Sequence, residues 1–461
     1  MKQPSLALCG LVILGLGCVS RAAPLLSSAP SSASPTISKA SANGSSAVIP
    51  SSTYQVLAQQ TDENLRRHIL DQWFPRALDT AKGGFLQNFA ENWSPRRETE
   101  KSVVYQARLT WLSAQAAQRY PNEKKRWSDI STHGANFLRD GLWDKQNGGF
   151  FWGVDANGSP QRSGEKHAYG VAFAIYALSA NYEITRDAAT LKLAQDAFKW
   201  LETHAHDAPN GGYNEALARD NRPMAPGAGR NDPVGTRYGL KSMNTHIHLL
   251  EAFAALYEIW PDPQLRTRLE EVFLLVRDKI AVSPPGALNL YFSPDWTPVP
   301  DHDSYGHDIE TAFLLIEAAA ALHIPDDPRT WEVARQLVDH TLDVGLDAKN
   351  GGFYDAGSVT GTISNPEKVW WVQGEALNAL LVMHDRFGAQ TSRYWDAFLA
   401  QWKWIQTRQI DVKNGGWYPE VRPDGTPIAG HIKSDGWTEG YHQGRAMLHV
   451  SALLQKKAKN P

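Results

Sequence analysis

The sequence predicts an all-α protein, an (α/α)6 barrel in which six outer helices surround six inner helices. Three observations lead to this fold class. A turn of Asp, three residues, Gly-Gly and an aromatic recurs about every 65 residues. Apolar residues with helical spacing fill the intervals between the turns. Alternating β-branched residues are scarce, so little sheet is expected beyond short hairpins at the turn end.

The turns have a structural role in this prediction. Glycine allows positive φ and a close approach of two backbones, and the aromatic that follows packs onto a neighbouring helix. A sixth, degenerate copy of the turn lies in the widest gap between the clear copies. It runs from Asp278 through Gly286 to Tyr291-Phe292. The five clear copies begin at Asp79, Asp144, Asp207, Asp347 and Asp411.

Two kinds of helical pattern alternate along the chain. One kind is apolar on nearly every face, as expected of inner helices: 101–118, 166–182, 241–258, 307–323, 368–385 and 441–455. The other is amphipathic, as expected of outer helices: 62–77, 123–139, 187–204, 262–280, 327–344 and 391–409. All inner helices then start at the turn end. Their first residues should surround one mouth, close to the partly positive helix N-termini.

The N-terminal segment predicts export. Residues 1–23 have Lys2, a short apolar run and a small-residue end typical of a signal peptide, with a run too short for a permanent membrane span. A cut after Ala22 or Ala23 is the first interpretation, and lipid attachment at Cys18 is the alternative. The protein is therefore expected to be periplasmic or secreted.

The mature chain is expected to form one domain. Residues 24–55 are a Ser/Ala/Pro tract expected to be a disordered tether, and 56–461 form the barrel. Both cysteines, Cys9 and Cys18, lie in the signal segment, so the barrel has neither a disulfide nor thiolate chemistry. We expect a monomer or a weak homodimer.

The composition limits the partners. A net charge of −3 gives no electrostatic footprint for nucleic acid or an anionic membrane. The 17 tryptophans favour either stacking on sugar rings or aromatic core packing. No Gly-x-Gly-x-x-Gly or phosphate loop occurs in the sequence, so no cofactor is expected.

The inner-helix starts carry histidines with acidic neighbours. His248 and Glu251, like His307 and Glu310, are three residues apart and share one helical face. A carboxylate beside imidazole raises its pKa and fixes its tautomer, which suits general acid/base catalysis. The alternative is a zinc site. Because His-Glu-x-x-His is absent and acidic ligands are not clustered in the sequence, no metal site is expected.

Four motifs resemble the N-acylglucosamine 2-epimerase superfamily. They are Asn-Thr-His-x-His-x-x-Glu at 244–251, Gly-His-Asp-Ile-Glu at 306–310, Trp-Trp-Val-Gln-x-Glu-Ala at 370–376 and Tyr-His-x-x-Arg at 441–445. The resemblance extends over roughly residues 58–455 and implies the same barrel fold. It also implies inversion of C2 in the reducing-end aldose of cellobiose- or mannobiose-type β-1,4 disaccharides, which interconverts glucose and mannose.

The resemblance implies a role for each candidate residue. His307 and His442, on opposite inner helices, remove and return the C2 proton, and Glu310 supports His307. His248 assists ring opening, with Asn244 and Glu251 beside it. The remaining residues bind the sugar: Arg108 at the C1 oxygen, and Tyr169, Trp370, Trp371 and Trp437 around the ring. Gly440 and Gln443 differ from the Pro and Asn usual in disaccharide-epimerising members, and Phe313 stands where Trp is common.

Three other functions are compatible with parts of the pattern. Return of the proton to C1 would make the enzyme an aldose–ketose isomerase of the mannose isomerase type. A glycoside hydrolase would need two carboxylates flanking the bond. A non-catalytic sugar-binding protein would keep the tryptophans but would have no use for the His–Glu pairs.

Overall fold

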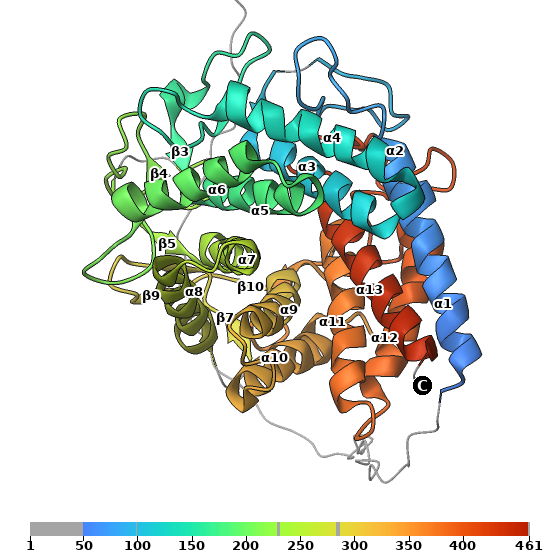
Figure 1. Ribbon diagram of the computed structural model, residues 1–461. Helices are drawn as coiled ribbons and strands as arrows, with labels where there is room; N and C mark the ends of the chain where they lie inside the picture. Colours follow the sequence, from blue (N-terminus) through green and yellow to red (C-terminus); the bar gives the residue numbers. More distant parts are fainter. Residues whose placement is uncertain (1–48, 98, 228–230, 283–285, 460–461) are drawn as a thin grey trace, which may run out of the picture. The chain divides into compact units, whose positions relative to one another are not determined.

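The computed structural model describes residues 49–97, 99–227, 231–282 and 286–459 (Figure 1). The predicted signal peptide and residues 24–48 of the predicted tether lie outside these ranges. No helix in the described ranges has the length and apolar character needed to cross a membrane.

The fold is the predicted (α/α)6 barrel. Neighbouring inner helices contact each other in chain order, and the last contacts the first, which closes the ring. The inner helices are α3 (Val103–Arg119), α5 (Ala168–Thr185), α7 (Met243–Ile259), α9 (Tyr305–Ala321), α11 (Trp370–Phe387) and α13 (Tyr441–Lys459). They are buried on nearly every face, as their apolar sequences require.

Each outer helix contains a π-helical turn in its C-terminal part, and in all but the first this turn ends the helix. The first consists of α1 (Ser51–Asn64), η1 (Leu65–Leu70) and α2 (Asp71–Trp73). The others are α4 (Lys124–Phe137), α6 (Ala188–Trp200), α8 (Pro263–Leu275), α10 (Pro328–His340) and α12 (Arg393–Trp404). Their π-helical turns are η3 (Leu138–Leu142), η5 (Leu201–Ala205), η6 (Val276–Ile280), η7 (Thr341–Gly345) and η8 (Ile405–Gln409).

The first outer helix was predicted in the wrong place. The expected range was 62–77, whereas the helix begins at Ser51 and includes residues 51–55 of the predicted tether. Tyr54, Leu57 and Ala58 are buried, and α1 packs against α13. This tertiary packing outweighs the weak helix propensity of the Ser-Ser start, so the barrel begins earlier than the composition indicated.

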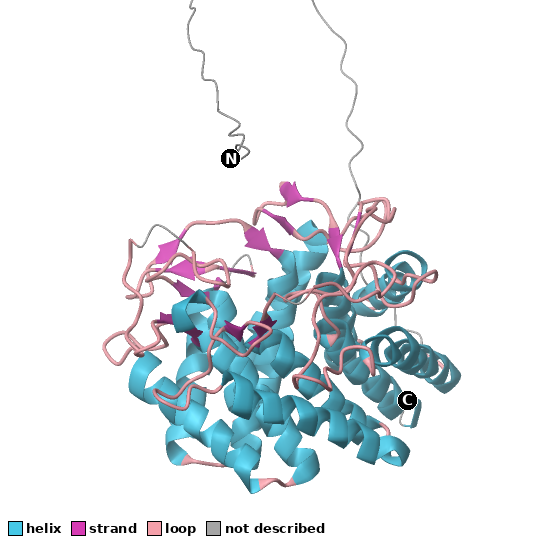
Figure 2. Ribbon diagram, turned by 90° about the horizontal axis from the view of Figure 1, so that it is seen from above, coloured by secondary structure: helices cyan, strands magenta, loops and turns pink. Residues whose placement is uncertain are grey.

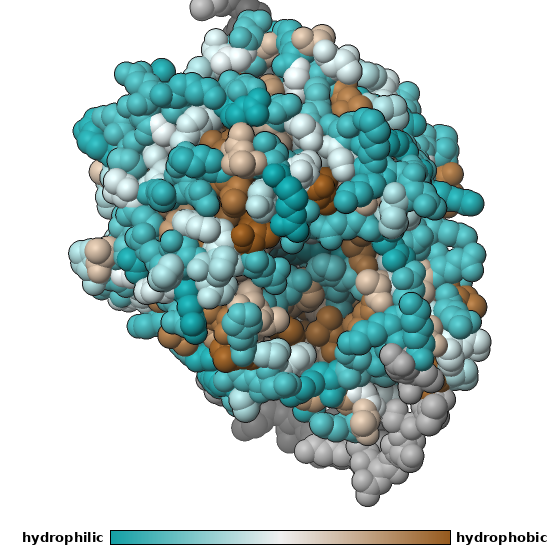
Figure 3. Space-filling model, in the orientation of Figure 1, coloured by the Kyte–Doolittle hydropathy of each residue, from teal (hydrophilic) through white to brown (hydrophobic). Residues whose placement is uncertain are grey.

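Short antiparallel strand pairs gather at one end of the barrel (Figure 2). They are β1 (Lys101–Ser102), β2 (Gly153–Val154), β3 (Lys166–His167), β4 (Ala216–Leu217), β5 (Lys241–Ser242), β6 (Ala281–Val282), β7 (Ala287–Leu288), β8 (Tyr291–Phe292), β9 (Pro298–Val299), β10 (Asp303–Ser304), β11 (Ala356–Gly357), β12 (Ile363–Asn365), β13 (Lys368–Val369) and β14 (Glu420–Val421). Several of these strands immediately precede an inner helix and thereby fix where that helix starts. The opposite end of the barrel faces the viewer in Figure 1, and its middle is hollowed (Figure 3).

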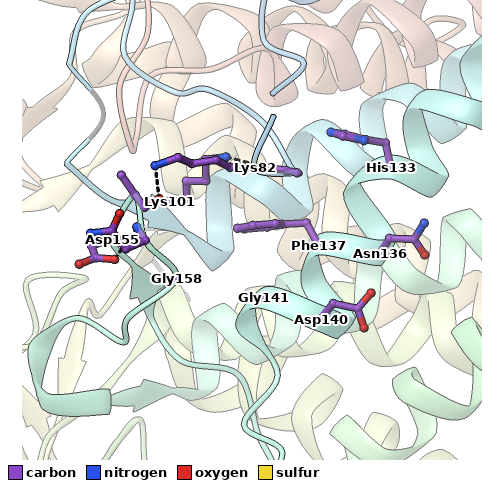
Figure 4. Close-up of a pocket in the computed structure, with 12 residues that line it drawn as sticks. Lys82, Lys101, His133, Asn136, Phe137, Asp140, Gly141, Asp155 and Gly158 are labelled. Carbon is purple, nitrogen blue, oxygen red and sulfur yellow. Dashed lines mark hydrogen bonds between the residues drawn. The ribbon is translucent and has the colours of Figure 1, made fainter. Parts of the chain in front are cut away.

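A buried lysine stabilises each clear Gly-Gly turn. In the first repeat Gly83 and Gly84 have φ of 80° and 66°, and the Lys101 ammonium contacts Asp79 at 2.6 Å. Phe137 covers this turn (Figure 4), and a Cβ at Gly84 would lie 2.6 Å from its ring. We term this Asp–Lys pair the turn lock. It recurs as Asp144–Lys166, Asp207–Lys241, Asp347–Lys368 and Asp411–Lys433.

Candidate active site

A cavity of about 220 Å³ lies at the barrel end that carries the strands. It is lined by ten predicted site residues, which come from all six inner helices and the loop before α13, together with Val234. These ten are Arg108, Tyr169, Asn244, His248, His307, Glu310, Trp370, Trp371, Trp437 and His442. Their side chains meet because every inner helix begins at this end. Glu251 lies behind the cavity wall and contacts it through His248.

Arg445 is the centre of a buried ionic layer beneath the cavity. Its guanidinium is fully buried and donates to Glu251, Glu310 and Glu375. Burial alone would raise the pKa of Glu251, but Arg445 and the hydrogen bond from His248 lower it to about 2. Glu375 and Arg445 belong to the recognised motifs, but no role was predicted for either, because their buried ionic partners lie 67 to 194 residues away in the sequence.

His248 forms the pair that its spacing predicts. Its Nδ1 contacts Glu251 Oε2 at 3.0 Å. A carboxylate only accepts hydrogen bonds, so Nδ1 carries the proton and Nε2 keeps its lone pair. The Tyr169 ring lies edge-on at 5.1 Å between centroids. Asn244, on the same helix, has an Oδ1 with no partner among the described residues, and so can accept from a sugar hydroxyl.

The predicted pairing of His307 with Glu310 is wrong. His307 Nδ1 is hydrogen-bonded to Ser304 Oγ at 2.7 Å, while Glu310 accepts from Arg445. The i,i+3 spacing permits the pair, but Ser304 occupies His307 Nδ1, and Glu310 Oε2 has no hydrogen-bond partner among the described residues. Burial lowers the pKa of His307 to about 4, although the nearby Glu310 charge opposes this. The imidazole is therefore neutral near pH 7.

His442 has carboxylate support from another helix. Its Nδ1 lies 2.9 Å from Glu375 Oε1 and 3.7 Å from Glu310 Oε1. Burial lowers the pKa of His442 well below its usual value, against the opposing effect of Glu310. The ring centroids of His442 and His307 lie 5.5 Å and 4.8 Å from that of Trp371.

The two histidines are not on opposite sides of the barrel. They belong to α9 and α13, and both of these helices contact α11, so a single inner helix separates them. Trp371 of that helix is close to both imidazoles. The two histidines were predicted to lie on opposite inner helices because they act on opposite faces of the substrate carbon C2. In the structure both imidazoles instead lie near one indole of the intervening helix.

Arg108 supplies a fixed positive charge. Its Nη1 donates to Glu439 at 2.9 Å and its Nη2 to the Tyr169 hydroxyl at 3.1 Å. The guanidinium also lies 4.3 Å from the centre of the Phe173 ring. Burial would lower the pKa of Arg108, but Tyr169 and Glu439 raise it above its ordinary value. The residue is cationic at every relevant pH.

Aromatic residues form the rim. Trp437 is 40% exposed and lies 6.1 Å from Tyr169 and 5.8 Å from Trp152 between ring centroids. Trp152 and the cavity-lining Val234 were not predicted. Val234 belongs to a loop in which Asp232 accepts three backbone N–H groups and His167 Nε2, and no local sequence signal shows which loop residue faces the cavity.

The expectation that acidic ligands are not clustered is wrong for the folded chain. Within the described ranges three groups of His and carboxylate come together, because helices distant in sequence converge. In Glu310–Glu375–His442, Arg445 already supplies the cation. In His167–Glu215–Asp232, the carboxylate oxygens accept hydrogen bonds from the backbone, Ser242 and His167. The third group, Asp303–Asp308–His340, does not line the cavity.

Two other cavities have no comparable set of groups. One of about 280 Å³ lies between the C-terminal halves of the inner helices, at the hollowed end in Figure 3, and is lined by Glu183, Glu258, Glu317 and His449 among others. Burial raises the pKa of Glu317 to about 8. The other, of about 550 Å³, lies at the first turn lock, where the ammonium groups of Lys82 and Lys101 are already bound (Figure 4). Neither brings the imidazoles of His307 and His442 together with the Arg108 guanidinium.

Comparison with known proteins agrees with this geometry. Residues 83–446 match the family described as N-acylglucosamine 2-epimerase (GlcNAc 2-epimerase). A cellobiose 2-epimerase of Bacteroides fragilis is 29% identical over 400 residues, 86% of this chain and 99% of the relative. The structure of cellobiose 2-epimerase from Spirochaeta thermophila DSM 6192 has a TM-score of 0.79 and 31% identity, and covers 88% of this chain and 98% of its own. A D-mannose isomerase of Marinomonas mediterranea is 24% identical over 398 residues, 83% of this chain and 94% of the relative. The chain belongs to the N-acylglucosamine 2-epimerase family.

Proposed function

We propose that the protein is a sugar 2-epimerase that inverts C2 of a reducing-end aldose, in β-1,4 disaccharides of the cellobiose and mannobiose type. The observation that carries the proposal is a pair of imidazoles, the half-buried His307 and the buried His442, both packed near Trp371 in one cavity with the Arg108 cation. The cellobiose 2-epimerases that share 29% and 31% of their residues with this chain support the choice of substrate.

Ring opening is the first step. His248 Nε2 accepts the proton of O1 as the bond from C1 to the ring oxygen breaks, and the imidazolium so formed returns that proton to the ring oxygen. The product is an open-chain aldehyde. Glu251 accepts from Nδ1 at 3.0 Å and so holds the tautomer with Nε2 free for this transfer.

Inversion follows through an enediolate. A neutral imidazole of the His307–His442 pair takes the C2 proton, the C–H electrons form a C1–C2 double bond, and negative charge moves to O1. Arg108 faces that oxygen, and one such donor is commonly worth ~3 kcal/mol. The second imidazole, as imidazolium, returns a proton to C2 on the other face. One imidazolium is consumed and one is formed, so the protons balance.

Glu375 supports this exchange. Because it accepts from His442 Nδ1 at 2.9 Å, it stabilises the imidazolium of His442 each time that residue gains a proton. Burial lowers the pKa of the same imidazole well below its usual value, and the nearby Glu310 charge opposes this only in part. Ser304 gives His307 a neutral partner instead. The two imidazoles are therefore inequivalent, since His442 Nδ1 faces a carboxylate and His307 Nδ1 faces a hydroxyl.

An aldose–ketose isomerase is the second candidate. Its enediolate is the same, but the proton returns to C1 and the product is a ketose. The 24% identity to a D-mannose isomerase is the observation in its favour. A hydrolase fits less well, because Glu310 is the one carboxylate among the described residues that line the cavity, and it is bound by Arg445.

Incubation of the enzyme with cellobiose, mannobiose and mannose in D₂O, followed by NMR, tests the proposal. Deuterium at C2 of an epimeric aldose is the expected result, and a ketose supports the isomerase. His442→Ala should abolish exchange, while His323→Ala, at an exposed residue beyond the far end of α9, should not. Absence of exchange in every sugar, with or without added divalent metal, refutes the assignment.

We also propose export of the chain by residues 1–23, with the mature protein free rather than anchored at Cys18. The short apolar run and the Arg21-Ala22-Ala23 end support this. The mass of the protein recovered from its source distinguishes the alternatives. A mature chain beginning at Ala23 or Pro24 is expected. A lipidated Cys18 at the N-terminus contradicts the proposal of a free protein.

A further inference from the structure

The fourth repeat has lost its turn lock, and its replacement is informative. In the first and fifth repeats the lysine of the turn lock is one of three side chains that contact the Gly-Gly turn. A buried lysine, Lys101 or Lys368, stands in the strand before the inner helix. The last residue of the next outer helix, Phe137 or Trp404, covers the turn. A glutamine five residues after the lysine accepts from the backbone N–H of the turn aromatic.

The equivalent positions of the fourth repeat carry three different residues. Asp303 stands in β10 where the others have lysine, and His340 is the last residue of α10 where the others have an aromatic. Asp308 follows Asp303 by five residues, and its Oδ1 accepts from Leu288 N at 3.0 Å, as the glutamines do. An ammonium, an aromatic ring and an amide have thus become two carboxylates and an imidazole.

The three side chains are buried together. Asp303, Asp308 and His340 are 1%, 0% and 6% exposed. His340 Nε2 contacts Asp303 Oδ2 at 2.8 Å, and one potential ligand atom from each residue lies within 4.8 Å of the others. Asp303 Oδ1 and Asp308 Oδ2 are buried with no hydrogen-bond partner in the described part of the chain. Burial and the neighbouring Asp303 raise the pKa of Asp308 well above its usual value.

The charge balance of Asp303, Asp308 and His340 differs from that of the turn locks. Each turn lock balances one buried carboxylate with one buried ammonium, whereas no lysine or arginine pairs with Asp303 or Asp308 in the described ranges. Two uncompensated buried carboxylates cost several kcal/mol. A bound cation would replace the lost ammonium, and the orphaned oxygens mark where it would bind.

We infer that Asp303, Asp308 and His340 bind a divalent transition-metal ion, with zinc the best match. Two carboxylates neutralise the charge of the ion, and an imidazole nitrogen with carboxylate oxygens is a zinc ligand set, completed by water as a fourth ligand. Magnesium and calcium prefer sites made entirely of oxygen. The ion replaces the lysine of the other repeats, so this site is structural and independent of the proposed sugar chemistry.

The site also has a mechanical consequence. It joins β10, the start of α9 and the end of α10, and Ser304, next to Asp303, is the partner of His307 Nδ1. A bound ion fixes the segment that presents His307 to the cavity. In the other repeats the cation at the start of the inner helix is a lysine side chain. In the fourth repeat it is a bound metal ion, which can exchange with the solvent.

Equilibrium dialysis of the untagged full-length protein against Zn²⁺, with metal analysis, tests the inference. Wild type should retain one zinc per chain more than Asp308→Asn, which keeps the acceptor for Leu288 N–H, and more than His340→Phe, which restores the aromatic of the first repeat. Asp232→Asn, in the fully satisfied His167–Glu215–Asp232 group, is the matched control and should bind as wild type does.

A second measurement requires only the wild-type protein. Zn²⁺ should raise the thermal midpoint and a chelator should lower it, while Co²⁺ should give the visible spectrum of a tetrahedral site. Equal zinc retention by wild type, Asp308→Asn and His340→Phe would mean adventitious binding and would refute the site. A midpoint unchanged by zinc and chelator would also refute it, leaving a proton shared between the carboxylates as the balancing charge.

Discussion

Replacement of His246 by glutamine should remove a specific part of the acid lability of the barrel. His246 is fully buried and neutral in the fold: Nδ1 lies 2.7 Å from Ser242 O, and Nε2 accepts from Tyr213 N at 3.1 Å. Burial lowers its pKa from 6.5 to about 4. A protonated imidazole cannot accept the Tyr213 N–H. Gln106 performs the same task in the first repeat, so His246→Gln is a native-like change.

The sign and size follow from linkage. Because the folded pKa is depressed, the unfolded chain binds the proton first as the pH falls. The stability contribution is complete above the unfolded pKa of 6.5 and is lost as the pH falls towards the folded pKa of about 4. At about pH 4.5 this loss amounts to about 2.5 kcal/mol for one buried histidine.

Urea denaturation of both proteins at about pH 7.5 and about pH 4.5 measures the difference. Other titrating groups, including Glu215 at 3.7 Å from His246 Nδ1, are common to the two proteins and largely cancel. Wild type should lose about 2.5 kcal/mol more than His246→Gln between the two pH values. Equal losses would refute the interpretation that burial holds His246 neutral in the fold.

Three further predictions concern the site. Glu375→Gln should lower kcat about 10-fold with KM little changed. The reason is that a neutral amide stabilises the His442 imidazolium about 1.4 kcal/mol less well than a carboxylate does. An unchanged kcat would contradict this role of Glu375. Arg445→Met should lower the free energy of unfolding by about 3–5 kcal/mol, because three carboxylates lose their cation, and a loss below about 1 kcal/mol in urea denaturation contradicts the ionic layer. Trp437→Ala should raise KM for cellobiose about 5- to 10-fold and leave KM for mannose nearly unchanged, since the exposed indole stacks on the second ring; equal effects on both sugars contradict it.

Local signals were strong wherever the chain repeats. The Gly-Gly turns and the apolar periodicity correctly predicted five of the six outer helices and all inner helices to within a few residues. The first outer helix failed because Ser51 and Ser52 resemble tether in composition, and only the packing of α1 on α13 makes them helical. The turn-lock lysines could have been found from the sequence, since Lys101, Lys166 and Lys433 each follow their turn Asp by about 22 residues.

Pairing within the site depends on geometry that sequence spacing does not contain. His248 pairs with Glu251 Oε2 while Arg445 binds Oε1 of the same carboxylate, whereas His307 is bonded to Ser304 and Glu310 contacts Arg445. Glu375 reaches His442 from another helix. The i,i+3 rule describes which groups can meet on one helix, and competition among helices decides which of them do.

The sequence by itself determined the barrel, the end at which the inner helices start and ten side chains that line one cavity, because repetition and periodicity are local properties of the chain. Only the tertiary structure decided how these groups are connected: the ionic layer around Arg445, the separation of His307 and His442 by α11, and the meeting of Asp303, Asp308 and His340 at the degenerate turn. Each of these depends on electrostatic competition between groups that burial brings together from distant helices, where a charge without a partner is costly.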